Sequence, residues 1–425
     1  MRISISKKIV LNLFLRGISA SLKLFFLLYI ARVNGNIFVG EYSLIMSISA
    51  ISIILLGFEI HSGFGRIIHK LDEPTQKEYI GSQLKFYISL YIIVIPILIF
   101  VSIWYIKLKF ITALILSITI CIDHLALELF RILITKLKTR EAIIFNFIKS
   151  VPLLLVLIFL DYFNLIKISI FMYVLFWLLN NIFSIFLLFT QFKLQNILPD
   201  FKNIYNFKYD HFFLLANESK FYYLLSIVGS ITSNFDKLIL AKTIGLEKLG
   251  IYFALISFGS IINIFLSYTI GMHQGPEIVK DFAISGYNYY IKKRVLLFKD
   301  YFIYSFISSI IILIGFQIGN SLKITNYSEY LLEFLFVIFS IIILAISEVY
   351  KMDIYLAKFD KQLFLTNLYI LVISLSNLYI LSVKFGILGS TAALFINSIF
   401  QFAFFYNYSK KSLKFLNNQF LIKLN

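Results

Sequence analysis

Apolar runs of about 20 residues, the length needed to cross a bilayer as a helix, recur along the whole chain. We expect twelve spans, at residues 9–31, 38–60, 83–106, 110–134, 142–160, 168–190, 215–241, 250–273, 298–318, 328–350, 362–383 and 386–408. The longer loops are expected at 61–82, 191–214 and 274–297. A transmembrane barrel would instead alternate apolar and polar positions in segments of about 10 residues. The pattern therefore predicts an all-α membrane protein.

The composition agrees with this prediction. Hydrophobic residues make up 60% of the chain, charged residues make up 14%, and the mean hydropathy is +0.88. A soluble domain is only about half apolar. The single cysteine, Cys121, lies within an apolar run, so we expect neither an intramolecular disulfide nor a cysteine-rich metal site.

The net charge of +17 could suggest a nucleic-acid partner, but basic residues also gather in the cytoplasmic loops of membrane proteins. With twelve spans, one side holds 23 Lys and Arg residues and the other side only eight. The eight are Arg32, Lys107, Lys109, Lys167, Lys242, Lys248, Lys323 and Lys384. We therefore expect both termini to be cytoplasmic and no nucleic acid to bind.

An internal repeat links two distant parts of the chain at an offset of 210 residues. The segment ARVNGNIFVGEYSLIMS (31–47) aligns without gaps on AKTIGLEKLGIYFALIS (241–257). The matching positions are Ala31/Ala241, Arg32/Lys242, Gly35/Gly245, Gly40/Gly250, Tyr42/Tyr252 and Ser47/Ser257. Six spans separate the two copies, so the halves are expected to be parallel six-helix repeats.

Parallel repeats are an architecture of membrane transporters. We expect an amino-terminal six-helix lobe at residues 1–200 and a carboxyl-terminal six-helix lobe at 201–425. The glycines in the repeated turn allow a tight chain reversal.

The first span carries a polar stripe of Asn12, Arg16, Ser19 and Lys23, at spacings of four, three and four residues. These spacings place the four side chains on one helical face. Charges at membrane depth are costly and usually face water or a partner. Two cations on this stripe suit an anionic group, because arginine can hold a phosphate through two hydrogen bonds. The alternative is a basic amino-terminal anchor with one residue buried by packing.

The seventh span carries a similar stripe, which consists of Ser226, Ser230, Ser233 and Lys237, with Asp236 turned away from it. Asp236 is expected to bind a coupling cation or to form a gate with Arg16 or Lys23. Local pairing of Lys237 near the end of the helix is the other interpretation.

The fourth span holds Asp123, His124, Glu128 and Arg131. The last three share a face, and a structural charge network is preferred there over a proton relay. Two ligands of the type His-x3-Glu do not make a metal site, and none is predicted. Further polar residues near the cytoplasmic ends of spans are Glu59, His61, His273 and Glu348.

Catalytic signatures are absent from the sequence. There is no phosphate-binding loop of the form GxxxxGK[ST], no nucleophile elbow and no HExxH motif. The expected outward loops do not exceed about ten residues, which leaves no room for a glycosyltransferase or polymerase site. We expect a transporter without a cofactor rather than an enzyme, driven by a proton or sodium gradient or by downhill use of its substrate.

The segments NFDKLILAKTIGLEKLGIYFALIS and GNIFVGEYSLIMSIS resemble polysaccharide flippases. These are the Wzx-type O-antigen and capsule repeat-unit flippases of the multidrug/oligosaccharidyl-lipid/polysaccharide exporter superfamily. The resemblance implies a two-lobed bundle, like that of the multidrug exporters, around a cationic cavity. It also implies that Arg16, Lys23, Lys237 and Asn12 hold a pyrophosphate, and that Asp236, Asp123, Glu128 and Arg131 act in gating or ion coupling.

The implied substrate is an undecaprenyl-pyrophosphate-linked oligosaccharide, which moves to the outer leaflet of the bacterial inner membrane for O-antigen, lipopolysaccharide or capsule synthesis. The protein would be a monomer among membrane lipids, with the polysaccharide polymerase and chain-length machinery as partners. The alternatives are a cation-coupled drug exporter of the same superfamily, for which the basic stripe is unfavourable, and a membrane glycosyltransferase or polymerase.

Overall fold

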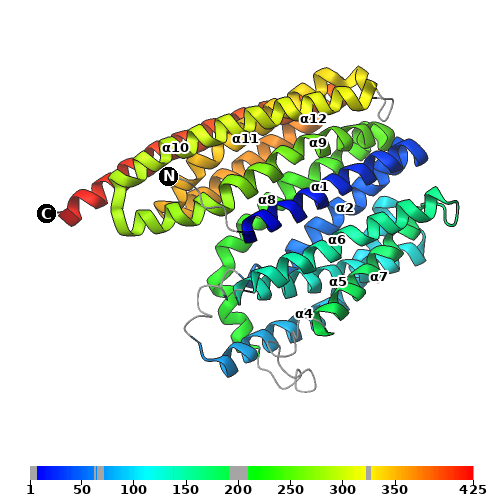
Figure 1. Ribbon diagram of the computed structural model, residues 1–425, viewed down its shortest axis with the longest axis horizontal. Coiled ribbons are helices and arrows are strands. Elements are labelled where there is room, and N and C mark those ends of the chain that lie inside the picture. Colours follow the sequence, from blue (N-terminus) through cyan, green and yellow to red (C-terminus); the bar gives the residue numbers. More distant parts are fainter. Residues whose placement is uncertain are drawn as a thin grey trace. The chain divides into compact units, whose positions relative to one another are not determined.

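The computed structural model describes residues 7–61, 64, 71–136, 138–190, 209–321 and 327–424, which form helices and turns without any strand (Figure 1). The α-helices are α1 (Lys7–Asn34), α2 (Asn36–Gly57), α4 (Glu73–Val101), α5 (Phe110–Thr135), α6 (Thr139–Tyr162), α7 (Ile170–Thr190), α8 (Asp210–Thr243), α9 (Gly245–Leu266), α10 (Met272–Ser321), α11 (Leu331–Leu356) and α12 (Asp360–Leu424). Short helical turns extend α4 at Ser102–Ile106, join α9 to α10 at Ser267–Gly271 and precede α11 at Ser328–Tyr330.

Eleven helices of the described chain are long and apolar enough to span a membrane. In α12 the candidate segment, Lys361–Asn418, has 58 residues, whereas about 20 suffice for one crossing. The backbone of α12 breaks at Gly386, where φ is 61° and the chain reverses. The two limbs of α12 therefore supply the eleventh and twelfth spans, and the predicted all-α membrane fold is confirmed.

The loop predicted at 274–297 is wrong, because α10 runs through it with a break at Gly286, where φ is 74°. Lys292, Lys293 and Arg294 lower the hydropathy of this stretch. Lys and Arg are nevertheless good helix formers, so the helix continues where the apolar run ends. Hydropathy locates the part of a helix that lies in lipid and misses its extension into water.

The chain folds into two compact units. Unit 1 comprises Met1–Phe26 and Leu44–Ser230, and unit 2 comprises Leu27–Ser43 and Ile231–Asn425. Both α1 and α8 therefore contribute to each unit. The predicted lobe boundary near residue 200 stays a prediction, since residues 191–208 lie outside the described part of the chain.

The core of unit 1 joins α4, α5 and α8. Phe86 and Phe212 stack with their ring centroids 3.7 Å apart, and Phe212 is almost fully buried. Tyr87, Ala126 and Leu129 belong to the same buried cluster. In unit 2, α11 packs along α12, α10 and α9, and Phe316 stacks on Phe334 at 4.2 Å. Packing of large side chains thus holds each bundle together.

The two copies of the repeated turn meet within unit 2. A Cβ atom on Gly40 would lie 2.2 Å from the carbonyl oxygen of Leu246, and one on Gly250 would lie 2.0 Å from that of Asn36. These are equivalent contacts, because both pairs are related by the offset of 210 residues. Gly35 and Gly245 also have nearly the same φ, 84° and 81°. The repeat is therefore structural as well as sequential.

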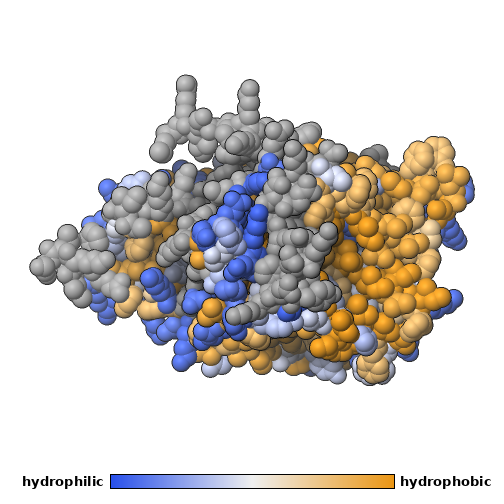
Figure 2. Space-filling model, turned by 90° about the horizontal axis from the view of Figure 1, so that it is seen from below, coloured by the Kyte–Doolittle hydropathy of each residue, from blue (hydrophilic) through white to orange (hydrophobic). Residues whose placement is uncertain are grey.

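Large apolar side chains cover much of the outside of the helices, as the broad hydrophobic areas in Figure 2 show. Ile92, Phe100 and Trp104 are 73%, 66% and 67% exposed. In water such a surface would be unfavourable by roughly 25 cal/mol per Å². Lipid is the environment that this surface fits.

Candidate functional site

A cationic cluster in unit 1 is the best-formed site among the predicted residues. Lys149 on α6 places its Nζ 2.7 Å from Oδ1 of Asp123 on α5. The same Nζ is 3.4 Å from the carbonyl oxygen of Asp123. Both side chains are mostly buried, with 15% and 11% exposed. Asp123 was predicted as a gating or coupling residue, and the structure shows that it has a basic partner on the next helix.

A proline determines the shape of α6 beside Lys149. Pro152 has no N–H group, so the carbonyl of Ile148, four residues earlier, loses its helical donor. The side-chain amide of Asn180 on α7 donates to this carbonyl at 3.4 Å and to the carbonyl of Lys149 at 2.5 Å. The amide therefore ties the backbone at Lys149 to α7 and supports the position of the ammonium group.

Lys23 on α1 is exposed and lies within electrostatic reach of both Lys149 and Asp123. The cluster thus combines two ammonium groups with one carboxylate, and carries a net charge of one when all three are ionised. Nearby, Phe26 of α1 stacks on Tyr173 of α7 at 5.8 Å, which anchors this part of the helix. An exposed cation that interacts with a buried ion pair can attract an anion.

The rest of the polar stripe on α1 is described only in part. Ser19 donates to the carbonyl of Leu15 at 2.9 Å, as serine often does within a helix. The backbones of Asn12 and Arg16 belong to α1, but their side chains lie outside the described residues. Their proposed contact with a pyrophosphate stays a prediction.

Glu128 and Arg131 form a second, separate cluster. Nη1 of Arg131 is 2.7 Å from Oε1 of Glu128, and Gln83 on α4 donates to Oε2 at 2.7 Å. The hydroxyl of Tyr87 is 3.4 Å from the same Oε2 and donates to the carbonyl of Gly57 at 2.9 Å. Glu128 is fully buried, and this arrangement satisfies its charge. The predicted charge network exists, although His124 contributes less to it than Gln83 does.

The end of α2 packs on this second cluster. Phe58 and Glu59 follow Gly57 with left-handed φ values of 50° and 51°, a conformation that costs energy in residues other than glycine. Oε1 of Glu59 lies 3.8 Å from Nη2 of Arg131, and Oε2 lies 3.3 Å from His61. The second cluster thus holds two acids near one arginine, and it lies where α2 ends.

Asp236 and Lys237 are both buried in unit 2, and they are paired with each other. Oδ1 of Asp236 lies 2.9 Å from Nζ of Lys237. The hydroxyl of Tyr252 on α9 donates to Oδ2 of Asp236 at 2.9 Å, and Lys237 also donates to the carbonyl of Ser233. Lys237 was predicted to hold a pyrophosphate and Asp236 to bind a cation or to act as a gate. In the structure the charge of each side chain is neutralised by the other.

The sequence did not identify a fourth polar group, in which α10, α11 and α12 meet. Nε of Arg294 lies 2.9 and 3.0 Å from the two carboxylate oxygens of Asp353, which is fully buried. Tyr290 donates to the same carboxylate at 2.5 Å, and Ser409 also donates to it. Both units thus place a buried acid where a tyrosine of the preceding helix reaches it, Tyr87 on Glu128 and Tyr290 on Asp353.

Comparison with protein-family models and with curated proteins gives no match. Solved structures do match. The lipid II flippase MurJ, in an inward closed conformation, has a TM-score of 0.68 at 13% identity, covering 97% of this chain and 91% of that one. A multidrug resistance transporter of the MATE family, in an inward-facing conformation, has a TM-score of 0.67 at 12% identity, covering 96% and 99%.

A transporter of the MOP superfamily from Pyrococcus furiosus, described as having a binding pocket of reversed polarity, has a TM-score of 0.57 at 15% identity, covering 96% of both chains. At these identities the likeness establishes the fold. This chain has the membrane fold that the MurJ flippase and the MATE exporters of the MOP superfamily share.

Proposed function

We propose that the protein is a flippase for an undecaprenyl-pyrophosphate-linked oligosaccharide, which it moves from the cytoplasmic to the outer leaflet of the plasma membrane. The product would serve the synthesis of a surface polysaccharide such as O-antigen or capsule. The observation that carries this proposal is the cationic cluster of Lys23, Lys149 and Asp123. Moving a pyrophosphate through hydrocarbon is costly, and positive charges within the helical bundle reduce that cost.

Two further observations support a lipid-linked substrate. MurJ, which has a similar fold along nearly the whole chain, is by its name a flippase of lipid II. The segments around Gly40 and Gly250 also resemble the polysaccharide flippases. The roles of Arg16 and Asn12 as further pyrophosphate ligands rest on their place in the stripe of α1.

A cation-coupled drug exporter is the second candidate, because the MATE structures match almost as well as MurJ does. An exporter of organic cations would need a free acid among the residues predicted to act in gating or ion coupling. Asp123, Glu128 and Asp236 each have a basic partner within 2.9 Å. The charge clusters that contain these three acids therefore favour an anionic substrate.

Deletion of the gene followed by lipid analysis tests the function. We expect single lipid-linked repeat units to accumulate on the cytoplasmic face, because they are made there and cannot cross. A polymerase mutant would accumulate them on the outer face. Unchanged lipid-linked oligosaccharide together with increased sensitivity to cationic drugs would contradict the flippase proposal and support the exporter.

Lys149→Met tests the cationic cluster. A charge-assisted hydrogen bond contributes about 1.5–3 kcal/mol, so we expect transport to fall by about 10- to 100-fold. Lys109→Met, which changes an exposed lysine just before α5, is the matched control and should leave transport unchanged. Normal surface polysaccharide in a strain that carries only Lys149→Met would exclude the cluster as the pyrophosphate site.

Arg16→Ala tests Arg16, which is a predicted pyrophosphate ligand on α1 beside Lys23. We expect it to abolish transport without affecting insertion into the membrane, measured as polysaccharide on the cell surface and as protein in the membrane fraction. Arg16→Lys should restore transport only in part, because lysine cannot form the two parallel hydrogen bonds of arginine to a phosphate.

A further inference from the structure

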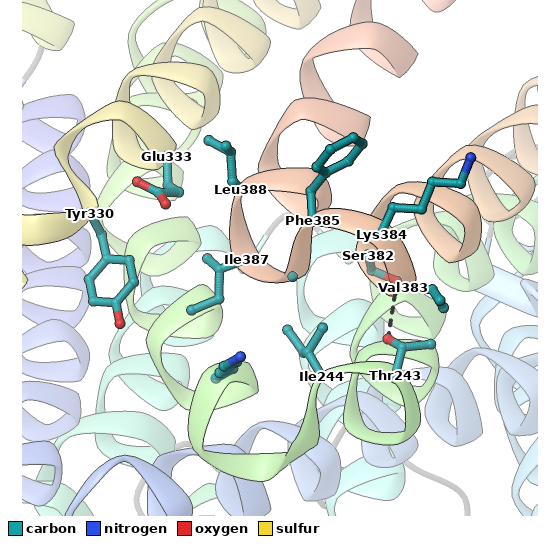
Figure 3. Close-up of a pocket in the computed structure, with 12 residues that line it drawn as sticks. Thr243, Ile244, Tyr330, Glu333, Ser382, Val383, Lys384, Phe385, Ile387 and Leu388 are labelled. Carbon is teal, nitrogen blue, oxygen red and sulfur yellow. Dashed lines mark hydrogen bonds between the residues drawn. The ribbon is translucent and has the colours of Figure 1, made fainter.

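A cavity of about 640 Å³ lies within unit 2, at the end where α8 turns into α9. This volume falls within the range of small-molecule sites, about 300–1,000 Å³. Four structural parts line it, namely the α8–α9 turn, the first turn of α9, the start of α11 and the break in α12 (Figure 3). Neither the charge clusters nor the proposed function accounts for it.

The fold determines the shape of this cavity. The hydroxyl of Ser382 donates to that of Thr243 at 3.1 Å, which joins α12 to the end of α8 (Figure 3). Gly386, with φ of 61°, reverses α12 beside this bond. A Cβ on Gly389 would lie 1.9 Å from the carbonyl oxygen of Leu381, so the two limbs of α12 can approach this closely only with glycine there. The cavity wall is therefore held by packed backbone.

The lining combines charge, hydroxyl and apolar groups. Glu333 and Tyr330 enter from the α11 side, and Ile244 and Ile387 lie across from them (Figure 3). Lys248 lines the cavity from the first turn of α9. Within the described part of the chain, neither Glu333 nor Lys248 forms an ion pair, in contrast to the buried charges of the clusters. A second lysine, Lys384, also lines the cavity, but its ammonium group points away from Glu333 and Tyr330 (Figure 3). The carboxylate of Glu333 and the ammonium group of Lys248 are thus available to a ligand.

We propose that this cavity binds a sugar unit of the transported oligosaccharide. Glu333 accepts hydrogen bonds from sugar hydroxyls, Lys248 donates to hydroxyl or ring oxygens, and Tyr330 can do both. Ile244 and Ile387 pack against the C–H face of the sugar ring. Convergent polar groups beside a few apolar side chains are typical of a site that orients a small polar ligand. A pyrophosphate fits less well, because Glu333 would repel it.

This inference rests on the proposed function, which supplies the oligosaccharide. On the orientation predicted from Lys and Arg, the α8–α9 turn faces outward. The cavity would then bind the sugar on the side where it is released.

Binding of the free sugar tests the inference separately from transport. Oligosaccharides are released by mild acid from the lipid extract of the host, applied to the immobilised, purified full chain, and identified by mass spectrometry after elution. We expect the wild type to retain an oligosaccharide, and Glu333→Gln/Tyr330→Phe to bind it at least tenfold more weakly. Lys109→Gln, far from the cavity in sequence and exposed, is the control that should bind normally.

A second measurement does not depend on the fold of the double variant. Val383 lines the cavity, is 57% exposed and is not one of the proposed ligands, so the thiol of Val383→Cys should be accessible, whereas the native Cys121 is buried. We expect the same oligosaccharides to slow the labelling of this thiol by a maleimide at least threefold. Equal retention by wild type and Glu333→Gln/Tyr330→Phe, or labelling that the sugars do not slow, would overturn the inference.

The two proposals fail in different ways. If deletion of the gene causes lipid-linked units to accumulate but the cavity variants retain sugar like the wild type, only the cavity inference is wrong. If retention depends on Glu333 but no lipid-linked unit accumulates, the flippase proposal is wrong and the sugar site remains.

Discussion

At the scale of single residues, the position of the Lys149 backbone depends on Pro152, three positions further along α6. Asn180 supplies the donor that Pro152 lacks, and a buried carbonyl left without a donor costs about 1–3 kcal/mol. We therefore expect Asn180→Leu to lower the free energy of unfolding by about that amount and to reduce transport. Thermal unfolding in detergent and surface polysaccharide measure the two effects.

Pro152→Ala is the matched partner of this variant, because alanine restores an N–H to the carbonyl of Ile148. In the Pro152→Ala background, Asn180→Leu should lower the free energy of unfolding by less than it does in the wild type. Equal costs in both backgrounds would show that the amide does not compensate for the proline.

The buried pair in α8 leads to a second prediction. Asp236→Asn removes the carboxylate and leaves the ammonium of Lys237 buried without a countercharge, at 7% exposure. Breaking a buried pair in this way costs about 3–5 kcal/mol, so we expect a large fall in thermal stability. Glu348→Gln, which breaks the more exposed Glu348–Lys351 pair, should cost less than about 1 kcal/mol. Similar losses in both variants would contradict this explanation.

A charged residue within an apolar run is easy to recognise in the sequence, but the residue that pairs with it in the fold is not. Glu128 and Arg131 lie one turn apart, and a charge network between them was predicted. The pairing of the adjacent Asp236 and Lys237 was only the alternative interpretation. Lys149 was missed because its carboxylate partner, Asp123, is 26 residues away on another helix. No spacing rule for a single helix reports such a contact, and only the packing of α5 on α6 and α7 creates it.

At the scale of the elements, the repeated turns can be tested as a pair. Gly40→Ala and Gly250→Ala each place a Cβ against a backbone carbonyl, at 2.2 and 2.0 Å. Because a backbone cannot rotate away as a side chain can, the two turns must separate. We expect each variant to lower the free energy of unfolding by about 1–3 kcal/mol, to a similar extent, measured by thermal unfolding.

Gly229→Ala is the control for these variants. It lies within α8, and nothing lies within 4 Å of its added Cβ. Alanine there should be neutral or should stabilise the helix by up to about 1 kcal/mol. If one turn tolerates alanine and the other does not, the contacts of the two turns are not equivalent.

The repeat predicted these turns from aligned glycines, because a tight reversal limits which residues fit. Hydropathy was less informative about helix length. It placed the end of the eleventh span close to Gly386, where α12 breaks, but it predicted a loop where α10 is helical. Apolar runs mark the parts of the chain that lie in lipid, and aligned glycines mark the turns. The polar stretch of α10 has no apolar run, so hydropathy does not reveal that it is helical.

At the scale of the whole molecule, the number of spans determines which ends share a side of the membrane. Twelve crossings would put both termini on the same side, and the 23 to eight distribution of Lys and Arg predicts that this side is the cytoplasm. In the described part of the chain eleven helices are long and apolar enough to cross, and the broken helix α12 is long enough to cross twice, which agrees with twelve crossings. The direction stays a prediction, because a bundle of helices has the same packing in either orientation.

Cysteine labelling measures the direction. Cys121 is buried, so a single introduced thiol should dominate the reaction. Lys109 and Lys358 are both exposed, and lie just before α5 and just after α11. In intact cells we expect an impermeant maleimide to label Lys109→Cys, and to label Lys358→Cys only after permeabilisation. The opposite result would place the sugar cavity on the cytoplasmic side, where the oligosaccharide is made, and would contradict the proposal that the cavity binds the sugar on the side of its release.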